Sequence, residues 1–353
     1  RKESSAASDV YKRQTLVYNG EIYNYIEIRK ELIDEGFLFK TTSDTEVLLY
    51  ALICWGREAI NKLNGMFAFG FFDRKEEKLL LGRDRFGVKP LFYYNKNNRF
   101  YFASTTRALA RLLDCTPNQS YASRGLVSGI YDDDTEFSAF NDLPSLQPGH
   151  TAEISFKSPQ ATINIERYYN LYDGVMSTIE EIKNDTKEEL LERLNSLLLS
   201  AISIRLRSDV PLAISISGGL DSTTIGAITK KQKNNLIGYT LGQPENIKTE
   251  GPQVKLFSQE TGTKINYIWP TPEKLKEEFW RTLRDQDAPF TTGSMIAQNL
   301  IFQEANRCGS KVLLGGQGGD EGFMGYRKYV LFHLLRMFEN KQYISGLNFF
   351  LNQ

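Results

Sequence analysis

The chain has 353 residues, of which 41% are hydrophobic and 24% are charged, values typical of an ordinary soluble globular protein with two or three domains. Lysine and arginine together number 43, as do aspartate and glutamate, so no basic excess indicates nucleic acid binding. No apolar run is long enough to span a bilayer. Two histidines and three scattered cysteines (Cys54, Cys115 and Cys308) leave little material for a histidine-built metal site or a disulfide framework, and they favour a cytoplasmic location.

The first part of the chain, residues 15–156, is rich in short aromatic and β-branched runs that are broken by Asn, Asp and Gly. Such runs predict strands and hairpins, and Asn97-Asn98 marks one hairpin tip. Helices are expected over 25–35 and 45–55. This mixture predicts an α+β fold with layered sheets.

A looser stretch follows, and we expect a linker at 157–185. The second part, 186–353, opens with a capping box formed by Thr186 and Glu189, ahead of leucines at helical spacing. Strand and helix patterns then alternate. Strands are expected over 211–217, 236–241, 265–269 and 312–314, and helices over 223–233, 251–262, 273–284 and 295–308. Alternation of this kind predicts a parallel α/β sheet.

One glycine-rich turn lies between the strand at 211–217 and the helix that follows it. It reads Ser217-Gly218-Gly219-Leu220-Asp221-Ser222. A turn of this kind directs backbone N–H groups and the positive end of a helix at one point, which favours a phosphate. An acid there indicates a divalent cation between it and the phosphate, and the Walker A ending is absent. The alternative is a tight turn that is merely glycine-rich.

A second glycine-rich turn, 315–321, follows the strand at 312–314 and carries Asp320. Ligands of open parallel sheets bind beyond the carboxyl ends of the strands. If the two strands are neighbours, Asp221 and Asp320 would lie on either side of one magnesium–pyrophosphate, since Mg²⁺ prefers oxygen ligands.

The order of these two motifs resembles the synthetase domain of the glutamine-hydrolysing asparagine synthetases, an N-type ATP pyrophosphatase. Upstream, the segments 18–25, 42–46, 63–69, 82–91 and 102–104 resemble the class II glutamine amidotransferase domain of the same family. The resemblance implies an incomplete α+β Ntn-type layered amidotransferase domain at 15–156, followed by an incomplete α/β parallel-sheet ATP pyrophosphatase domain at 186–353. Residues 1–14 show no family likeness, and we interpret them as a leader that arose from cloning or assembly.

For the amidotransferase domain, the resemblance implies that the Asn19 side chain and the Gly20 N–H form an oxyanion hole, while Glu21 and Asp44 hold the α-amino group of glutamine. Two alternatives stay open, because Asn-Gly is a common turn dipeptide and Asp44 could cap a helix. The nucleophilic cysteine of the family is absent from this chain, and we interpret the three cysteines present as structural.

For the synthetase domain, the resemblance implies that ATP adenylates the β-carboxylate of aspartate and that ammonia from glutamine then gives asparagine, AMP and pyrophosphate. The implied pyrophosphate cradle is Ser217, Gly218, Gly219 and Ser222, and the implied Mg²⁺ ligands are Asp221 and Asp320. The implied adenosine contacts are Ser215, Leu241, Gly315 and Gly316, although Leu241 could equally be a core residue. Gln317 stands where the best-known bacterial members carry a glutamate, so it cannot take a proton there.

Three functions are compatible with the sequence. The first is a glutamine-hydrolysing asparagine synthetase that acts on glutamine, aspartate and ATP, with no nucleic acid or membrane partner and with a homodimer allowed. The second is an amide-forming ligase of the same fold for another carboxylate, from a polysaccharide or natural-product pathway. The third is a nucleotide-binding pseudoenzyme. Because the cysteine and a C-terminal lysine region of the family are missing, we expect this fragment itself to be inactive.

Overall fold

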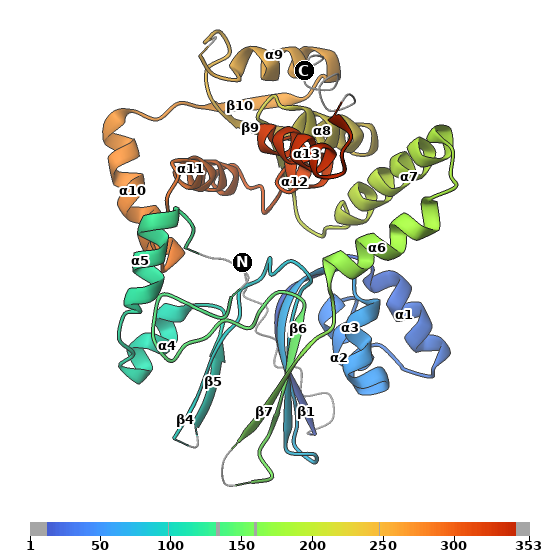
Figure 1. Cartoon of the computed structure of the whole chain (residues 1–353), viewed down its shortest axis with the longest axis vertical. Coiled ribbons are helices and arrows are strands. Elements are labelled where there is room, and N and C mark those ends of the chain that lie inside the picture. Colours follow the sequence, from blue (N-terminus) through green and yellow to red (C-terminus); the bar gives the residue numbers. More distant parts are fainter. Residues whose placement is uncertain (1–12, 98, 132–134, 159–160, 247, 344–353) are drawn as a thin grey trace. The chain divides into compact units, whose positions relative to one another are not determined.

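The protein is described by a computed structural model, which covers residues 13–97, 99–131, 135–158, 161–246 and 248–343 (Figure 1). The chain divides into two units. Unit 1 consists of residues 1–196 and 279–293, and unit 2 consists of residues 197–278 and 294–353. A segment from late in the chain therefore belongs to the unit formed by its first half.

Unit 1 is built on a five-stranded antiparallel sheet in the order β1-β2-β3-β6-β7. Its strands are β1 (Gln14–Ile22), β2 (Gly65–Asp73), β3 (Lys78–Arg83), β6 (His150–Ser155) and β7 (Thr162–Arg167). A separate hairpin pairs β4 (Phe92–Lys96) with β5 (Arg99–Ala103). The hairpin predicted around Asn97 is confirmed, and Asn98 lies outside the described residues.

The helices of unit 1 agree with the predicted ones and add several more. They are α1 (Tyr25–Asp34), α2 (Asp44–Trp55), η1 (Gly56–Glu58), α3 (Ala59–Lys62), α4 (Thr106–Leu113), α5 (Gln119–Ser128) and α6 (Leu171–Ile182). Helix α2 is buried along most of its length, from Thr45 to Leu52, which explains why its sequence is apolar on every face.

Two cores lie on opposite faces of the five-stranded sheet. Because side chains alternate along a strand, Phe67 and Phe69 of β2 join the core formed with α1 and α2, whereas Ala68 joins a second core. The second core includes Leu91 and Tyr93, which lie at the start of the hairpin β4–β5. The sheet is thus covered by helices on one face and by the hairpin on the other, as the layered α+β prediction required.

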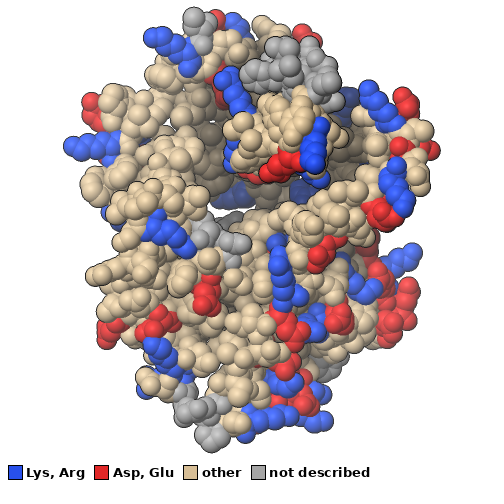
Figure 2. Space-filling view, in the orientation of Figure 1, with Lys and Arg blue, Asp and Glu red and all other residues tan. Residues whose placement is uncertain are grey.

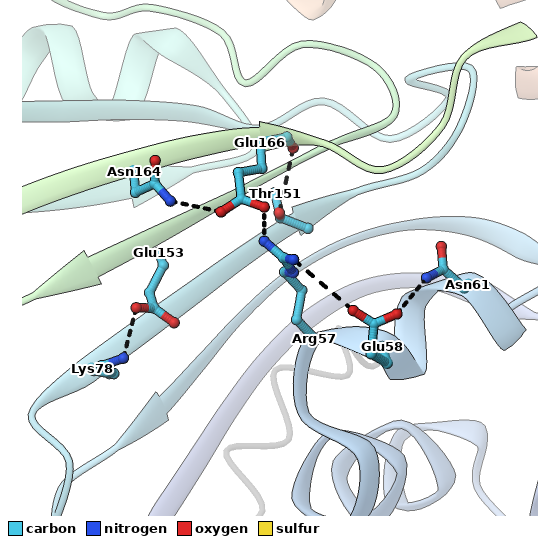
Figure 3. Close-up of polar contacts among 8 residues, drawn as sticks. All are labelled: Arg57, Glu58, Asn61, Lys78, Thr151, Glu153, Asn164 and Glu166. Atoms are coloured by element: carbon cyan, nitrogen blue, oxygen red, sulfur yellow. Dashed lines mark hydrogen bonds and ion pairs between the residues drawn. The ribbon is translucent and has the colours of Figure 1, made fainter. Parts of the chain in front are cut away.

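The stretch 157–185, which was expected to be a linker, holds β7 and α6. Strand β7 pairs along its whole length with β6. Figure 3 shows that Glu166 of β7 is also held from outside the strand, by an ion pair with Arg57 of η1. Within the strand, Asn164 donates to the same carboxylate at 2.7 Å. The sheet of unit 1 therefore extends beyond residue 156.

The first strand is anchored at its start by Asp73 of β2. Arg13 and Gln14 both donate to this carboxylate at 3.0 Å. Burial would raise the pKa of Asp73, but these hydrogen bonds outweigh it and lower the pKa to about 2. Gln14, the last residue of the expected leader, is therefore part of the sheet, and Arg13 is bonded to it through Asp73.

Unit 2 is built on a four-stranded parallel sheet in the order β10-β9-β8-β11. The strands are β8 (Leu212–Ser215), β9 (Ile237–Leu241), β10 (Lys264–Ile268) and β11 (Val312–Leu314). The helices between them are α8 (Leu220–Gln232), α9 (Gly251–Thr261), α10 (Pro272–Gln286) and α11 (Ser294–Arg307), followed by α12 (Gly319–Phe323) and α13 (Arg327–Glu339). The part of α10 from residue 279 onward belongs to unit 1. The predicted alternation of strands and helices is confirmed.

The faces of this parallel sheet are covered by different helices. Val254 and Phe257 of α9 pack with Ile214 in one core, and Ile301 of α11 packs with Tyr239 in the other. The preceding helix α7 (Lys187–Arg205) starts at the predicted capping box, in which Thr186 donates through its N–H to Glu189 Oε2 at 2.8 Å.

The surface carries charges of both signs. On the face seen in Figure 2, Lys and Arg side chains are interspersed with Asp and Glu side chains among the described residues. Within the described part of the chain, no helix is both long and apolar enough to cross a membrane.

Candidate functional sites in the two units

The residues predicted for glutamine binding lie on β1 and at the start of α2. Asn19 and Gly20 are not in a turn, because they pair within the sheet with Ala68 and Phe67. Gly20 is required by packing: a Cβ there would lie 2.3 Å from the carbonyl oxygen of Met66. The structure therefore excludes the turn alternative and explains the glycine.

Asn19 and Glu21 are both exposed, and alternation along β1 puts them on the same face of the strand. The Asn19 side chain is held from another element, since its Nδ2 donates to Ser104 Oγ at 3.3 Å. Ser104 follows β5 and also lines a cavity of about 600 Å³ within unit 1. The cavity wall includes Arg83, Thr106, Tyr121, Ser138 and Asp287.

Asp44 lies beside the same strand but not as a helix cap. The N-cap of α2 is Ser43, whose hydroxyl accepts from the Thr45 N–H at 3.1 Å. Asp44 is the first helical residue, and its Oδ2 accepts from the Tyr18 hydroxyl at 2.8 Å and from the Ile22 N–H at 3.0 Å. The carboxylate is therefore tied to the two residues that flank Asn19, Gly20 and Glu21 on β1.

Tyr18 was not among the predicted site residues. Its side chain is 5% exposed, and burial first, then the negative charge of Asp44, raises the pKa of the hydroxyl. Tyr18 thus stays protonated and remains a donor to Asp44. The only sequence signal was its place next to Asn19 in the segment 18–25.

Two of the three cysteines have an environment that disfavours the thiolate, since burial raises the pKa of the Cys54 and Cys115 thiols. Cys308 is exposed and directly follows α11 in unit 2.

In unit 2, the two glycine-rich turns follow neighbouring strands. Strand β8 pairs with β9 on one side and with β11 on the other, so the chain order reverses at β8. This is the topological switch point at which open parallel sheets bind ligands. Both turns leave the carboxyl ends of the strands at this point.

The first turn is closed by its own hydroxyl groups. Ser217 Oγ and Ser222 Oγ lie 3.0 Å apart, and the Gly219 N–H donates to Ser217 Oγ at 3.3 Å. Gly218 has a φ of +82°, a left-handed conformation that favours glycine. Helix α8 begins directly after Gly219, which has no side chain to cap it, so the turn presents the start of a helix of 13 residues.

The second turn packs directly on the first. A Cβ on Gly316 would lie 3.1 Å from the Ser222 nitrogen, and one on Gly319 would lie 2.2 Å from Asp221 Oδ2. The approach at Gly319 is too close for a Cβ unless Asp221 shifts, and the approach at Gly316 is tight. Asp320 follows Gly319, so the contact brings the chain positions of both predicted metal ligands to the same place.

The remaining predicted residues of this site lie around the two strand ends. Ser215 ends β8, and a Cβ on Gly315 would lie 4.0 Å from the Ser215 Cβ. Gln317 is exposed within the second turn. Leu241 ends β9 and packs, partly buried, against the core that contains Tyr239, so both alternatives for this residue stay open.

Next to Asp320 lies a small polar cluster that sequence reasoning missed. The Tyr326 hydroxyl donates to Glu321 Oε1 at 2.8 Å, and this hydrogen bond lowers the pKa of Glu321 and raises that of Tyr326 to about 12. Among the described residues, no group of three or more His, Cys, Asp or Glu side chains could hold a metal ion.

Comparison with known proteins gives two domain matches. Residues 6–169 match the family model described as a glutamine amidotransferase domain, and residues 193–346 match the model described as asparagine synthase. The first match begins within residues 1–14, the expected leader.

Curated relatives match over both domains. Asparagine synthetase [glutamine-hydrolyzing] 3 of Bacillus subtilis is 30% identical over 328 residues, covering 88% of this chain and 52% of the relative. A putative asparagine synthetase [glutamine-hydrolyzing] 2 of Methanocaldococcus jannaschii is also 30% identical, covering 89% of this chain and 59% of the relative. The chain thus spans about half the length of the curated relatives it matches.

Proposed function

We propose that the full protein is a glutamine-hydrolysing asparagine synthetase, because this chain joins a match to the glutamine amidotransferase domain with a match to the asparagine synthase domain. In this proposal unit 1 binds glutamine and directs its side-chain amide to hydrolysis. Unit 2 binds ATP and activates the β-carboxylate of aspartate as an acyl-adenylate, which ammonia converts to asparagine with release of AMP.

The observation that carries the proposal is the pair of glycine turns at the switch point of unit 2. The backbone of Gly316 and Gly319 lies close to Asp221 and Ser222, and a Cβ on Gly319 would collide with the Asp221 side chain. A phosphate group needs this kind of bare backbone, together with a helix start such as that of α8. Ser217 and Ser222 add hydroxyl groups at the same place.

The donor set fits Mg²⁺ better than a metal that needs a protein cage. Mg²⁺ keeps several waters and is usually held by one or two carboxylates together with phosphate oxygens of the substrate. Asp221 and Asp320 would supply those carboxylates, and the bound ion would offset the charge of the pyrophosphate.

For unit 1, the proposal assigns Asn19 Nδ2 and the Gly20 N–H to the oxyanion and assigns Glu21 and Asp44 to the α-amino group of glutamine. Support comes from the exposure of Asn19 and Glu21 on one face of β1 and from the attachment of Asp44 to the same strand. Two carboxylates facing an ammonium group are a favourable arrangement.

Isothermal titration calorimetry of Mg–ATP binding to this chain tests the part of the proposal that concerns unit 2. Wild type should bind, and Asp221→Asn should bind at least about tenfold more weakly, because a carboxylate ligand is lost. The matched control is Asp209→Asn, which removes an exposed carboxylate of unit 2 from outside the turns. Equal affinity of wild type and Asp221→Asn would refute the assignment.

The second candidate, an amide-forming ligase for another carboxylate, shares every feature of unit 2 described above. The discriminating measurement is ATP-dependent pyrophosphate release by the full-length gene product against a panel of carboxylates. Release that depends on aspartate supports the first proposal, and release with a different acid supports the second. ATP binding without release for any acid would favour a nucleotide-binding role.

A further inference from the structure

We infer that Ser104 is a positioning residue of the glutamine site, which holds the side-chain amide of Asn19 in place for its role in the oxyanion hole. The inference rests on the proposed amidotransferase function of unit 1. It gives a role to the last residue of the segment 102–104, for which the motif alone indicated none.

The geometry at Asn19 fixes the position of its side-chain amide. A side-chain amide has two N–H donors on Nδ2 and one acceptor oxygen. One Nδ2 hydrogen is donated to Ser104 Oγ over 3.3 Å. The second hydrogen on the same nitrogen is then directed to a different point. A serine hydroxyl can donate as well as accept, so Ser104 restricts where the amide lies rather than selecting one of its two ends.

This position matters because an oxyanion needs a donor that is held at one point. Preorganised donors are effective because the cost of orienting them is met before the reaction. Ser104 meets part of that cost for an otherwise exposed side chain.

Ser104 itself is held by packing on both sides in the sequence. Two residues earlier, the ring of Phe102 lies against β2 at Gly70, where a Cβ would be 2.5 Å from the ring. Two residues later, Thr106 is 4% exposed and begins α4. The hydroxyl of Ser104 is thus presented from a fixed backbone between the hairpin β4–β5 and α4.

The location of Ser104 also agrees with a functional role. It is half-buried and lines the cavity of about 600 Å³ in unit 1, so its contact with Asn19 lies at the edge of an open space rather than in a packed core. Ser138, on the same cavity wall, differs in that its hydroxyl donates within its own loop, to the Phe140 carbonyl at 3.2 Å.

The test compares three variants of the chain: Ser104→Ala, Ser104→Thr, which keeps a hydroxyl, and Ser138→Ala, which removes a hydroxyl from the same cavity wall. Glutamine affinity is measured by calorimetry. The side-chain amide of Asn19 is followed by NMR with ¹⁵N-asparagine labelling and is assigned with Asn19→Ala.

We expect Ser104→Ala to bind glutamine about three- to tenfold more weakly, the loss typical of one hydrogen bond. Ser104→Thr and Ser138→Ala should stay within about twofold of wild type. In Ser104→Ala alone, the two Nδ2 proton resonances of Asn19 should shift and exchange faster with solvent.

Wild-type affinity in Ser104→Ala, or unchanged Asn19 amide resonances in that variant, would overturn the inference while leaving the proposed function intact. A weakening that is equal in Ser138→Ala would also overturn it, since the effect would then come from the cavity wall in general. If the wild-type chain binds no glutamine, the proposed function of unit 1 fails first and the inference falls with it.

Discussion

Asp84 gives the sharpest prediction for stability, because its buried carboxylate accepts four backbone hydrogen bonds. The side chain is 1% exposed. Its Oδ1 accepts from the Phe86 and Val88 N–H groups at 3.1 and 3.0 Å, and its Oδ2 accepts from the Phe67 and Lys89 N–H groups at 3.2 and 2.9 Å. This one residue therefore ties the loop after β3 to β2.

Asp84→Asn should leave two of these four donors without an acceptor. The asparagine oxygen replaces one carboxylate oxygen, but its NH₂ group then faces two N–H donors. Each buried donor left unsatisfied costs about 1–3 kcal/mol, so we expect a loss of about 2–6 kcal/mol in the free energy of unfolding. A loss of that size is a large share of the total stability of a typical domain, about 5–15 kcal/mol.

Urea unfolding followed by tryptophan fluorescence measures this loss. Asp142→Asn is the matched control, because Asp142 is exposed, is ion-paired with Lys96, and has a φ of +65° that asparagine tolerates well. The control should change the free energy of unfolding by less than about 1 kcal/mol. A loss below about 1 kcal/mol for Asp84→Asn as well would refute the role given to these hydrogen bonds.

Three further predictions address the sites and the first strand. Tyr18→Phe removes a buried donor to Asp44, so it should lower the glutamine affinity measured by calorimetry and should lower the stability by about 1–3 kcal/mol in thermal unfolding. Unchanged glutamine affinity would separate Asp44 from the glutamine site. Gly319→Ala places a Cβ 2.2 Å from Asp221 Oδ2 and should weaken Mg–ATP binding more than about tenfold. The control Gly322→Ala has no atom within 4 Å of its Cβ and should leave the affinity unchanged. Similar affinities in the two variants would contradict the close approach of the turns. The pKa of Asp73 falls from 3.8 to about 2 on folding, so the stability that this carboxylate contributes is present above about pH 4 and is lost as the pH falls through 2. The stability difference between wild type and Asp73→Asn in urea titrations should therefore shrink over this range. A difference that is independent of pH would count against the shift.

The sequence patterns predicted unit 2 well because its elements obey simple periodicities. Each predicted strand and helix from 211 to 314 appears within a few residues of its expected bounds. The capping box at Thr186 also forms as expected, because both of its partners are local. Even the meeting of the two glycine turns followed from the rule that ligands bind at strand ends, once β8 and β11 proved to be neighbours.

Features that depend on long-range packing were harder to predict. Strand β7 was missed although Ile163 and Ile165 alternate with polar residues, because the nearby prolines indicated a linker and only pairing with β6 reveals its partner. The contact of Asn19 with Ser104 joins residues 85 positions apart, and no local pattern encodes it. The hydrogen bond from Tyr18 to Asp44 joins residues 26 positions apart, so the motif that contains Tyr18 indicated only that the segment matters.

The discontinuous make-up of unit 1 limits how the protein can be dissected. Because residues 279–293 belong with residues 1–196, a single cut near residue 196 sends part of unit 1 away with the other fragment. An isolated N-terminal fragment would lose Asp287, the ion-pair partner of Arg107 and a residue of the cavity wall. If the two fragments are produced separately, the N-terminal one lacks residues 279–293 and the C-terminal one carries them without the rest of unit 1. Co-expression of the two complementary fragments is therefore the way to restore unit 1.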